Sequence, residues 1–92
     1  MHMQPQTDDI RRFVIDNFLF GQGAEALQND ESFLESEIID STGVLELVSF
    51  LEHHYHITVG DHELVPENLD SVDKASRFVT RKLAMAPEEP AA

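Results

Sequence analysis

The sequence predicts an all-α protein: a small four-helix bundle with three main helices, one short helix and a long first loop. Apolar residues recur at the spacing of an amphipathic helix in the segments 10–18, 44–55 and 72–83. One short run, Ile57-Thr58-Val59, alternates like a strand, but an isolated strand has no partner for its backbone. We therefore expect residues 57–59 to form an extended connector, with Ile57 and Val59 buried.

The first helix is expected to begin at Thr7, because threonine is a favoured N-cap. Its apolar stripe consists of Ile10, Phe13, Val14 and Phe18. Gly21 and Gly23 end the helix, and an irregular segment then continues to Asp40. A loop of this length is uncommon in a compact domain, so we expect it to be functional or partly folded and to be held by apolar anchors. The expected anchors are Phe33, Leu34, Ile38 and Ile39.

The second helix is expected to begin at Ser41 or Thr42. Five apolar residues follow at i, i+3, i+4, i+7 and i+11 and form its core-facing stripe: Val44, Leu47, Val48, Leu51 and Tyr55. Pro66 suits the first turn of a short helix, and Ser71 can cap the last one. The stripe of the last helix consists of Val72, Ala75, Phe78, Val79 and Leu83.

The 92 residues are expected to form one domain. We place a flexible N-terminal segment at 1–6, the helical domain at 7–84 and a disordered tail at 85–92. No segment has the length of a transmembrane helix and the N-terminus lacks the apolar core of a signal peptide, so we expect a cytoplasmic protein. The chain has no cysteine, which excludes disulfides and thiolate chemistry by its own side chains. So short a chain favours a binding or carrier module over an enzyme with a deep pocket.

The charge of the chain is strongly negative and unevenly distributed. Eighteen acidic residues oppose six basic ones, for a net charge of −12, and no Lys or Arg occurs between Arg12 and Lys74. Such a surface repels phosphate backbones and anionic lipids, so nucleic acids and membranes are poor partners. It attracts proteins with basic patches, mainly by accelerating encounter. A second interpretation is that the charge only keeps the protein soluble.

Ser41 is the strongest candidate for a functional residue. It follows Asp40 at the point where the irregular segment turns into the second helix. The start of a helix offers unpaired N–H groups and a positive dipole, which together favour a nearby phosphate. The alternative is that Ser41 is only an N-cap, the ordinary role of serine before a helix. No Gly-x-Ser-x-Gly pattern surrounds it, which argues against a hydrolase nucleophile.

The residues around Ser41 resemble the attachment signature of acyl and peptidyl carrier proteins. The resemblance is carried by Asp40-Ser41, Leu45-Glu46-Leu47-Val48 and Leu51-Glu52. It continues through Tyr55, the 57–59 connector and Asp61 to a last helix ending near Leu83, and so covers roughly residues 8–84. It implies a four-helix bundle of the acyl carrier protein type.

The resemblance also implies a function. In that family a separate phosphopantetheinyl transferase moves 4′-phosphopantetheine from coenzyme A to the serine, here Ser41, and the thiol of the arm holds cargo as a thioester. Asp40 would help to position the hydroxyl and a transferase-bound metal ion. A ligase that activates an acyl group or an amino acid, and downstream transferases, would be further partners of a catalytically silent, monomeric chain. Partner enzymes would meet Thr42, Leu45, Glu46, Ser49 and Glu52.

Two departures from the family pattern bear on the cargo. Thr42, followed by Gly43, stands where the family usually has leucine, and histidines replace acids late in the second helix, at His53, His54 and His56. Both favour a solitary or pathway-specific carrier, including one loaded with an amino acid, over a housekeeping fatty-acid carrier. Fatty acyl, polyketide and amino-acid cargo all stay open.

Two other interpretations remain. His53 and His56 could share a metal ion, but no carboxylate or cysteine completes a ligand set, so we expect solvated histidines and no metal site. The rival from another class is an unmodified acidic helical adaptor that binds basic partners through its second helix.

Overall fold

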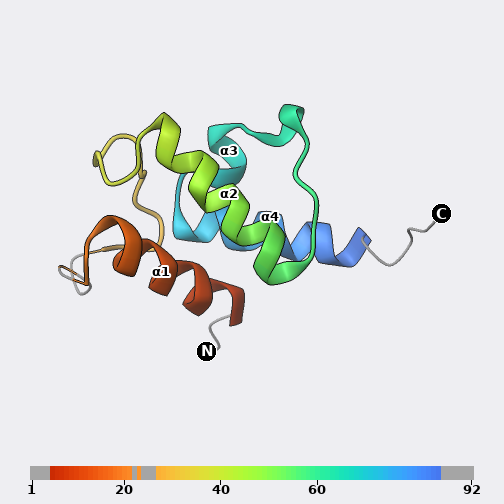
Figure 1. Ribbon diagram of the computed structural model, residues 1–92, viewed down its shortest axis with the longest axis horizontal. Helices are drawn as coiled ribbons and strands as arrows, with labels where there is room; N and C mark the ends of the chain where they lie inside the picture. Colours follow the sequence, from red (N-terminus) through yellow and green to blue (C-terminus); the bar gives the residue numbers. More distant parts are fainter. Residues whose placement is uncertain (1–4, 22, 24–26, 86–92) are drawn as a thin grey trace.

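The computed structural model describes residues 5–21, 23 and 27–85, and every regular element within them is helical (Figure 1). The elements are α1 (Pro5–Phe18), α2 (Ser41–Tyr55), the 3-10 helix η2 (Asp61–Glu63), α3 (Pro66–Leu69) and α4 (Val72–Met85). The predicted all-α bundle of three main helices and one short helix, with a long first loop, is confirmed. None of the helices described is long and apolar enough to cross a membrane.

Helix α4 is the element against which the other helices pack, since it contacts α1, α2 and α3. The Ser71 hydroxyl caps it as predicted, accepting a hydrogen bond from the Lys74 amide at 3.0 Å. The first four residues of its predicted stripe are buried: Val72, Ala75, Phe78 and Val79. The fifth, Leu83, is 36% exposed, because α4 extends past the other helices at its C-terminal end (Figure 1).

Helix α1 begins at Pro5, two residues before the predicted cap at Thr7. Proline suits the first turn of a helix, since its missing N–H would be unpaired there in any case. Thr7 is instead buried inside the helix, where its hydroxyl lies 2.9 Å from that of Ser76 on α4. Of the segment predicted to be flexible, residues 1–4 lie outside the described part of the chain, as do residues 86–92 of the predicted tail.

Aromatic rings join α1 to α2. Phe13 stacks on Phe50 with ring centroids 4.3 Å apart, and Phe50 stacks on His54 at 5.0 Å. Asp9 accepts a hydrogen bond from the Tyr55 hydroxyl at 3.1 Å and lies 3.2 Å from His54 Nε2. Burial and the bond to Asp9 raise the pKa of Tyr55, so this phenol stays a donor. His54 is expected to be a solvated histidine. Its side chain is 47% exposed, but its ring also stacks on Phe50 and contacts Asp9.

The loop between α1 and α2 is held by two of its predicted anchors, because Phe33 and Ile39 are buried. The Phe33 carbonyl accepts hydrogen bonds from the amides of Ile38 and Ile39, at 2.9 and 3.3 Å, in a tight turn. Of the other two predicted anchors, Ile38 packs partly buried against the core, whereas Leu34 is 43% exposed and lines a surface groove instead of the core. Leu27 is a buried anchor that the prediction missed.

The segment between α2 and α4 combines an extended connector with two short helices. Ile57 is buried as predicted, whereas Val59 is only partly buried. Pro66 lies in the first turn of α3, as predicted from its fixed φ and missing N–H. The 3-10 helix η2 was not predicted, because three residues show no hydrophobic periodicity.

Candidate functional site

The first turn of α2 leaves the Ser41 hydroxyl free. Asp40 is the N-cap, and its Oδ1 accepts a hydrogen bond from the Gly43 amide at 2.7 Å. Ser41 is the first helical residue, and its side chain is exposed without a hydrogen bond to any described residue. The alternative in which Ser41 is the N-cap is therefore wrong, because the preceding aspartate takes that role.

Gly43 explains how this turn packs closely on the end of α1. A Cβ atom at Gly43 would lie 2.9 Å from Phe18 Cε1 and 2.9 Å from Ile39 Cγ2. Both distances are shorter than carbon atoms tolerate, so a larger residue would push α2 away from Phe18. The glycine after Thr42 thus allows the first turn of the helix carrying Ser41 to lie close to Phe18 and Ile39.

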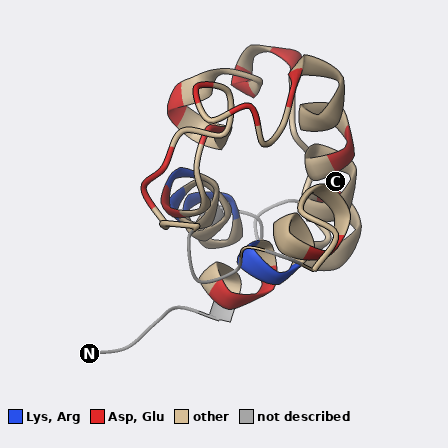
Figure 2. Cartoon of the chain, turned by 90° about the vertical axis from the view of Figure 1, so that its left-hand side faces the viewer, with Lys and Arg blue, Asp and Glu red and all other residues tan. Residues whose placement is uncertain are grey.

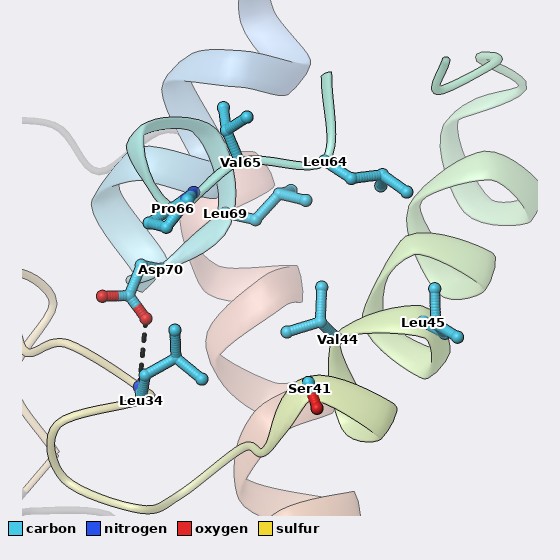
Figure 3. Close-up of a pocket in the computed structure, with 9 residues that line it drawn as sticks. All are labelled: Leu34, Ser41, Val44, Leu45, Leu64, Val65, Pro66, Leu69 and Asp70. Atoms are coloured by element: carbon cyan, nitrogen blue, oxygen red, sulfur yellow. Dashed lines mark hydrogen bonds between the residues drawn. The ribbon is translucent and has the colours of Figure 1, made fainter. Parts of the chain in front are cut away.

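A mostly apolar groove lies beside Ser41, between the start of α2 and α3 (Figure 3). Its volume is about 280 Å³. In Figure 3, Leu34 and Val44 point into the space below Leu69, and the Ser41 hydroxyl is directed away from these side chains. The residues that line it are Leu34, Ser41, Val44, Leu45, Leu64, Val65, Pro66, Leu69 and Asp70.

Sequence reasoning located Ser41 and Leu45 but missed the rest of the groove. Leu64, Val65 and Pro66 follow Ser41 by more than twenty residues, and nothing in their spacing marks them as neighbours of α2. Val44 belongs to the predicted core-facing stripe of the second helix, and Leu34 to the predicted anchors of the first loop. An apolar residue that lines a shallow groove has the same sequence signal as one that fills the interior.

The residues predicted to meet partners differ in how exposed their side chains are. Thr42, Glu46 and Ser49 are exposed, and Leu45 is 58% exposed, which is high for a leucine on a helix with a buried stripe. Glu52 differs, because it is partly buried and its Oε2 accepts a hydrogen bond from the Val59 amide at 2.9 Å. Glu52 therefore supports the 57–59 connector.

The charges of the chain are segregated by element. All six Lys and Arg residues lie on α1 and α4, whereas Asp and Glu also cover the first loop, α2 and the segment up to α4 (Figure 2). Within the described residues, no three or more His, Asp or Glu side chains are grouped so that they could hold a metal ion. His53 Nδ1 lies instead 3.0 Å from the Ser49 carbonyl oxygen of its own helix.

The helix order, the short α3 and the first turn of α2 define a fold of the acyl carrier protein type. A solved structure shows the likeness: the solution NMR structure of a holo acyl carrier protein from Nitrosomonas europaea. The two chains align with a TM-score of 0.73 and 21% sequence identity, over 88% of this chain and 99% of that one. No family model matches the sequence. At this identity the likeness concerns the fold, and the function of Ser41 has to be argued from its surroundings.

Proposed function

We propose that the chain is a phosphopantetheine-dependent carrier protein. It holds an acyl or aminoacyl group as a thioester on an arm attached to Ser41 and presents that group to partner enzymes. The observation that carries the proposal is the exposed hydroxyl of Ser41, which makes no hydrogen bond within the described part of the chain and follows an aspartate that already caps the helix. The solved structure of similar fold is that of a carrier protein in its holo form, which supports the same function.

The surroundings of Ser41 suit a phosphodiester. The first amides of a helix lack partners within it, and its dipole places positive charge at this end, so a phosphate on the Ser41 oxygen is stabilised. The Asp40 carboxylate would repel that phosphate. A divalent cation brought by a transferase would remove the repulsion during transfer, and Asp40 Oδ2 makes no hydrogen bond to a described residue that would prevent it from binding the cation.

The chain itself would perform no chemistry in this scheme. Its partners would be a phosphopantetheinyl transferase, a ligase that activates an acyl group or an amino acid, and downstream transferases. Thr42, Leu45, Glu46 and Ser49 form the exposed part of α2 next to Ser41, so they would meet these enzymes. An exposed leucine among acids offers both an apolar contact and a charge that orients a basic partner.

The test is incubation with coenzyme A and a broad-specificity phosphopantetheinyl transferase, followed by intact-mass analysis. The wild-type chain should gain one phosphopantetheine, and Ser41→Ala should gain none. Thr58→Ala removes an exposed hydroxyl of the 57–59 connector, which is not among the residues assigned to partners, and should still be modified, which makes it the matched control. A wild-type chain that stays unmodified while a known carrier is modified in parallel would contradict the proposal.

The segregation of charge supports a second candidate, an unmodified acidic adaptor that binds basic proteins through α2. This candidate requires nothing of Ser41. It predicts no mass gain in the transferase assay, together with partner binding that is unchanged in Ser41→Ala.

A further inference from the structure

Three bases share one side of α4. Lys74, Arg77 and Arg81 follow one another at i, i+3 and i+7, the spacing that brings side chains onto the same face of a helix. Arg77 and Arg81 are exposed and Lys74 is partly buried, so this face is turned away from the core. We refer to these three residues as the basic face of α4. In a chain with eighteen acids and six bases, such a cluster of positive charges is unexpected.

The charges of the basic face are not neutralised by acids of the protein. Neither Lys74 nor Arg77 forms an ion pair or a side-chain hydrogen bond with any described residue. Asp73 precedes Arg77 by four residues, a favourable spacing for an ion pair, yet the two do not pair. Like charges four residues apart, such as Arg77 and Arg81, weaken a helix. This repulsion is not offset within the described part of the chain, and an uncompensated local conflict of this kind is typical of a functional surface.

A surface hollow on α4 is lined by both arginines of the basic face. The described residues around it are Ser76, Arg77, Thr80 and Arg81. The Thr80 hydroxyl is engaged within the helix, because it donates to the Ser76 carbonyl at 3.0 Å. The Arg81 guanidinium is held in place by Asn68 Oδ1 at 2.9 Å, and that of Arg77 has no described partner. The donors that the hollow offers are therefore guanidinium N–H groups, which suit the paired oxygens of a carboxylate or a phosphate.

The extent of the basic face favours a short segment that carries carboxylates over a nucleic acid or a membrane. From Lys74 to Arg81 the helix rises by about 10 Å, which is two turns of a partner helix. A nucleic-acid strand carries a phosphate about every 3.4 Å, and a membrane is wider than the protein, so both would extend to the acids of the other elements (Figure 2). At 0.15 M salt the screening length is about 8 Å, so acids farther away barely oppose a segment confined to α4.

We propose that the basic face of α4 binds an acidic segment of a partner protein, whose carboxylates pair with Arg77 and Arg81. Neither arginine lines the groove beside Ser41, so this binding requires no arm on the serine and does not depend on the function proposed above. The acids of α2 attract basic partners, whereas the basic face of α4 attracts acidic ones. The two surfaces therefore select different proteins.

The test uses the unmodified full-length chain and an alanine-based helical peptide with three glutamates at i, i+3 and i+7. Titration followed by NMR should shift the amide resonances of Arg77, Thr80 and Arg81, and should leave those of Leu45 and Glu46 unchanged. A peptide with glutamines in place of the glutamates should cause no shifts. Because the contacts are ionic and exposed, raising the salt concentration should weaken binding. Binding that is independent of salt, or shifts confined to other elements, would overturn the proposal.

Two substitutions of arginine separate the position of a charge from its amount. Arg77→Gln should weaken binding of the peptide about two- to fivefold, the size expected for one exposed ion pair. Arg12→Gln removes an exposed arginine of α1 and is the matched control, with the affinity of wild type. Thermal unfolding shows whether each variant stays folded. Equal weakening by both substitutions would mean that only net charge matters, and the basic face would then be no binding surface.

Two further arms separate this inference from other partners and from the proposed function. Ser41→Ala should bind the peptide as wild type does, so a chain that never accepts an arm leaves the inference intact. A single-stranded oligonucleotide and vesicles of phosphatidylglycerol should not shift the Arg77 and Arg81 amides. If either shifts them while the peptide does not, the basic face serves another class of partner and the proposal is wrong.

Discussion

Asp40 and Ser41 are neighbours with separate tasks at the start of α2. One carboxylate oxygen of Asp40 accepts the hydrogen bond from the Gly43 amide, so the Ser41 hydroxyl is not needed as a cap and stays exposed. If Ser41 were itself the cap, its oxygen would be turned toward the helix backbone and would be a poorer site for modification. Capping by Asp40 therefore stabilises the start of the helix and also keeps the Ser41 hydroxyl accessible for the proposed modification.

Two substitutions of Asp40 separate its capping role from its role toward a metal ion. Asp40→Ala should lower the free energy of unfolding by about 1 kcal/mol. Asp40→Asn should leave the free energy of unfolding close to that of wild type, because asparagine caps a helix as well as aspartate does. Both should slow loading by the transferase, by about 10- to 100-fold, the typical effect of disturbing groups around a metal site. Urea unfolding and intact-mass time courses measure the two effects. If Asp40→Asn loads at the wild-type rate, Asp40 has no role toward a metal ion and serves only as the N-cap.

Gly43 provides a second prediction at this scale. Alanine in place of a helical glycine normally gains about 1 kcal/mol. Here the added Cβ would lie 2.9 Å from atoms of Phe18 and Ile39, and overpacking of this kind costs about 1–3 kcal/mol. We expect Gly43→Ala to lower the free energy of unfolding in urea by about 1 kcal/mol, the balance of these two effects. Thr42→Ala, at an exposed position of the same turn, should stay within about 0.5 kcal/mol of wild type. A more stable Gly43→Ala would show that Phe18 can move aside.

At the scale of elements, hydrophobic periodicity in the sequence predicts which segments form helices and which face of each helix is buried. The stripes of α2 and α4 locate most of the core, because a helix must bury one face whatever its neighbours are; of their ten residues, Val44, Tyr55 and Leu83 are not fully buried. Contacts between distant residues leave no such signal. Asp70 binds a loop more than thirty residues away, and Thr7 was assigned to a cap because its partner Ser76 cannot be identified from local sequence. The groove beside Ser41 depends on contacts of this second kind.

The short helix η2 is tied to α4 by one carboxylate. Glu63 accepts hydrogen bonds from the Gly60 amide at 2.9 Å and from Lys82 Nζ at 2.9 and 3.1 Å. The bond from the Gly60 amide, followed by the effect of Lys82, lowers the pKa of Glu63, and partial burial opposes this shift. A carboxyl whose pKa is lower in the folded than in the unfolded chain stabilises the fold while it is ionised.

This linkage predicts a pH-dependent effect of Glu63→Gln. The stabilisation is fully present above the ordinary glutamate pKa of about 4.3 and is lost as the pH falls through the lower, folded value. The variant should therefore be less stable than wild type near neutral pH, and the difference should shrink in acid. Urea unfolding between neutral pH and strongly acidic pH measures it. Glu67→Gln, an exposed acid of α3, should show no such trend. A difference that is independent of pH would contradict the role of the Glu63 charge.

At the scale of the whole molecule, the segregated charges should orient the encounter with a basic partner. The elements between α1 and α4, among them α2 with Ser41, carry acids without any Lys or Arg, whereas α1 and α4 mix both signs (Figure 2). The molecule measures 43 × 32 × 20 Å. At 0.01 M salt the screening length is about 30 Å, so all of these acids attract a partner, but at 0.15 M it is about 8 Å and only nearby charges count.

Association with a phosphopantetheinyl transferase should therefore slow as salt is raised, and the position of a charge should matter. Glu46→Gln and Asp16→Asn each remove one exposed acid, the first from α2 and the second from α1 beside Arg12. We expect Glu46→Gln to lower the association rate constant more than Asp16→Asn at low salt, because Glu46 shares a helix with Ser41. The two rates should converge at high salt, where the long-range field is screened. Stopped-flow measurements across ionic strength test this. A rate that does not change with salt would mean that these acids do not steer the partner and that the charge serves solubility alone.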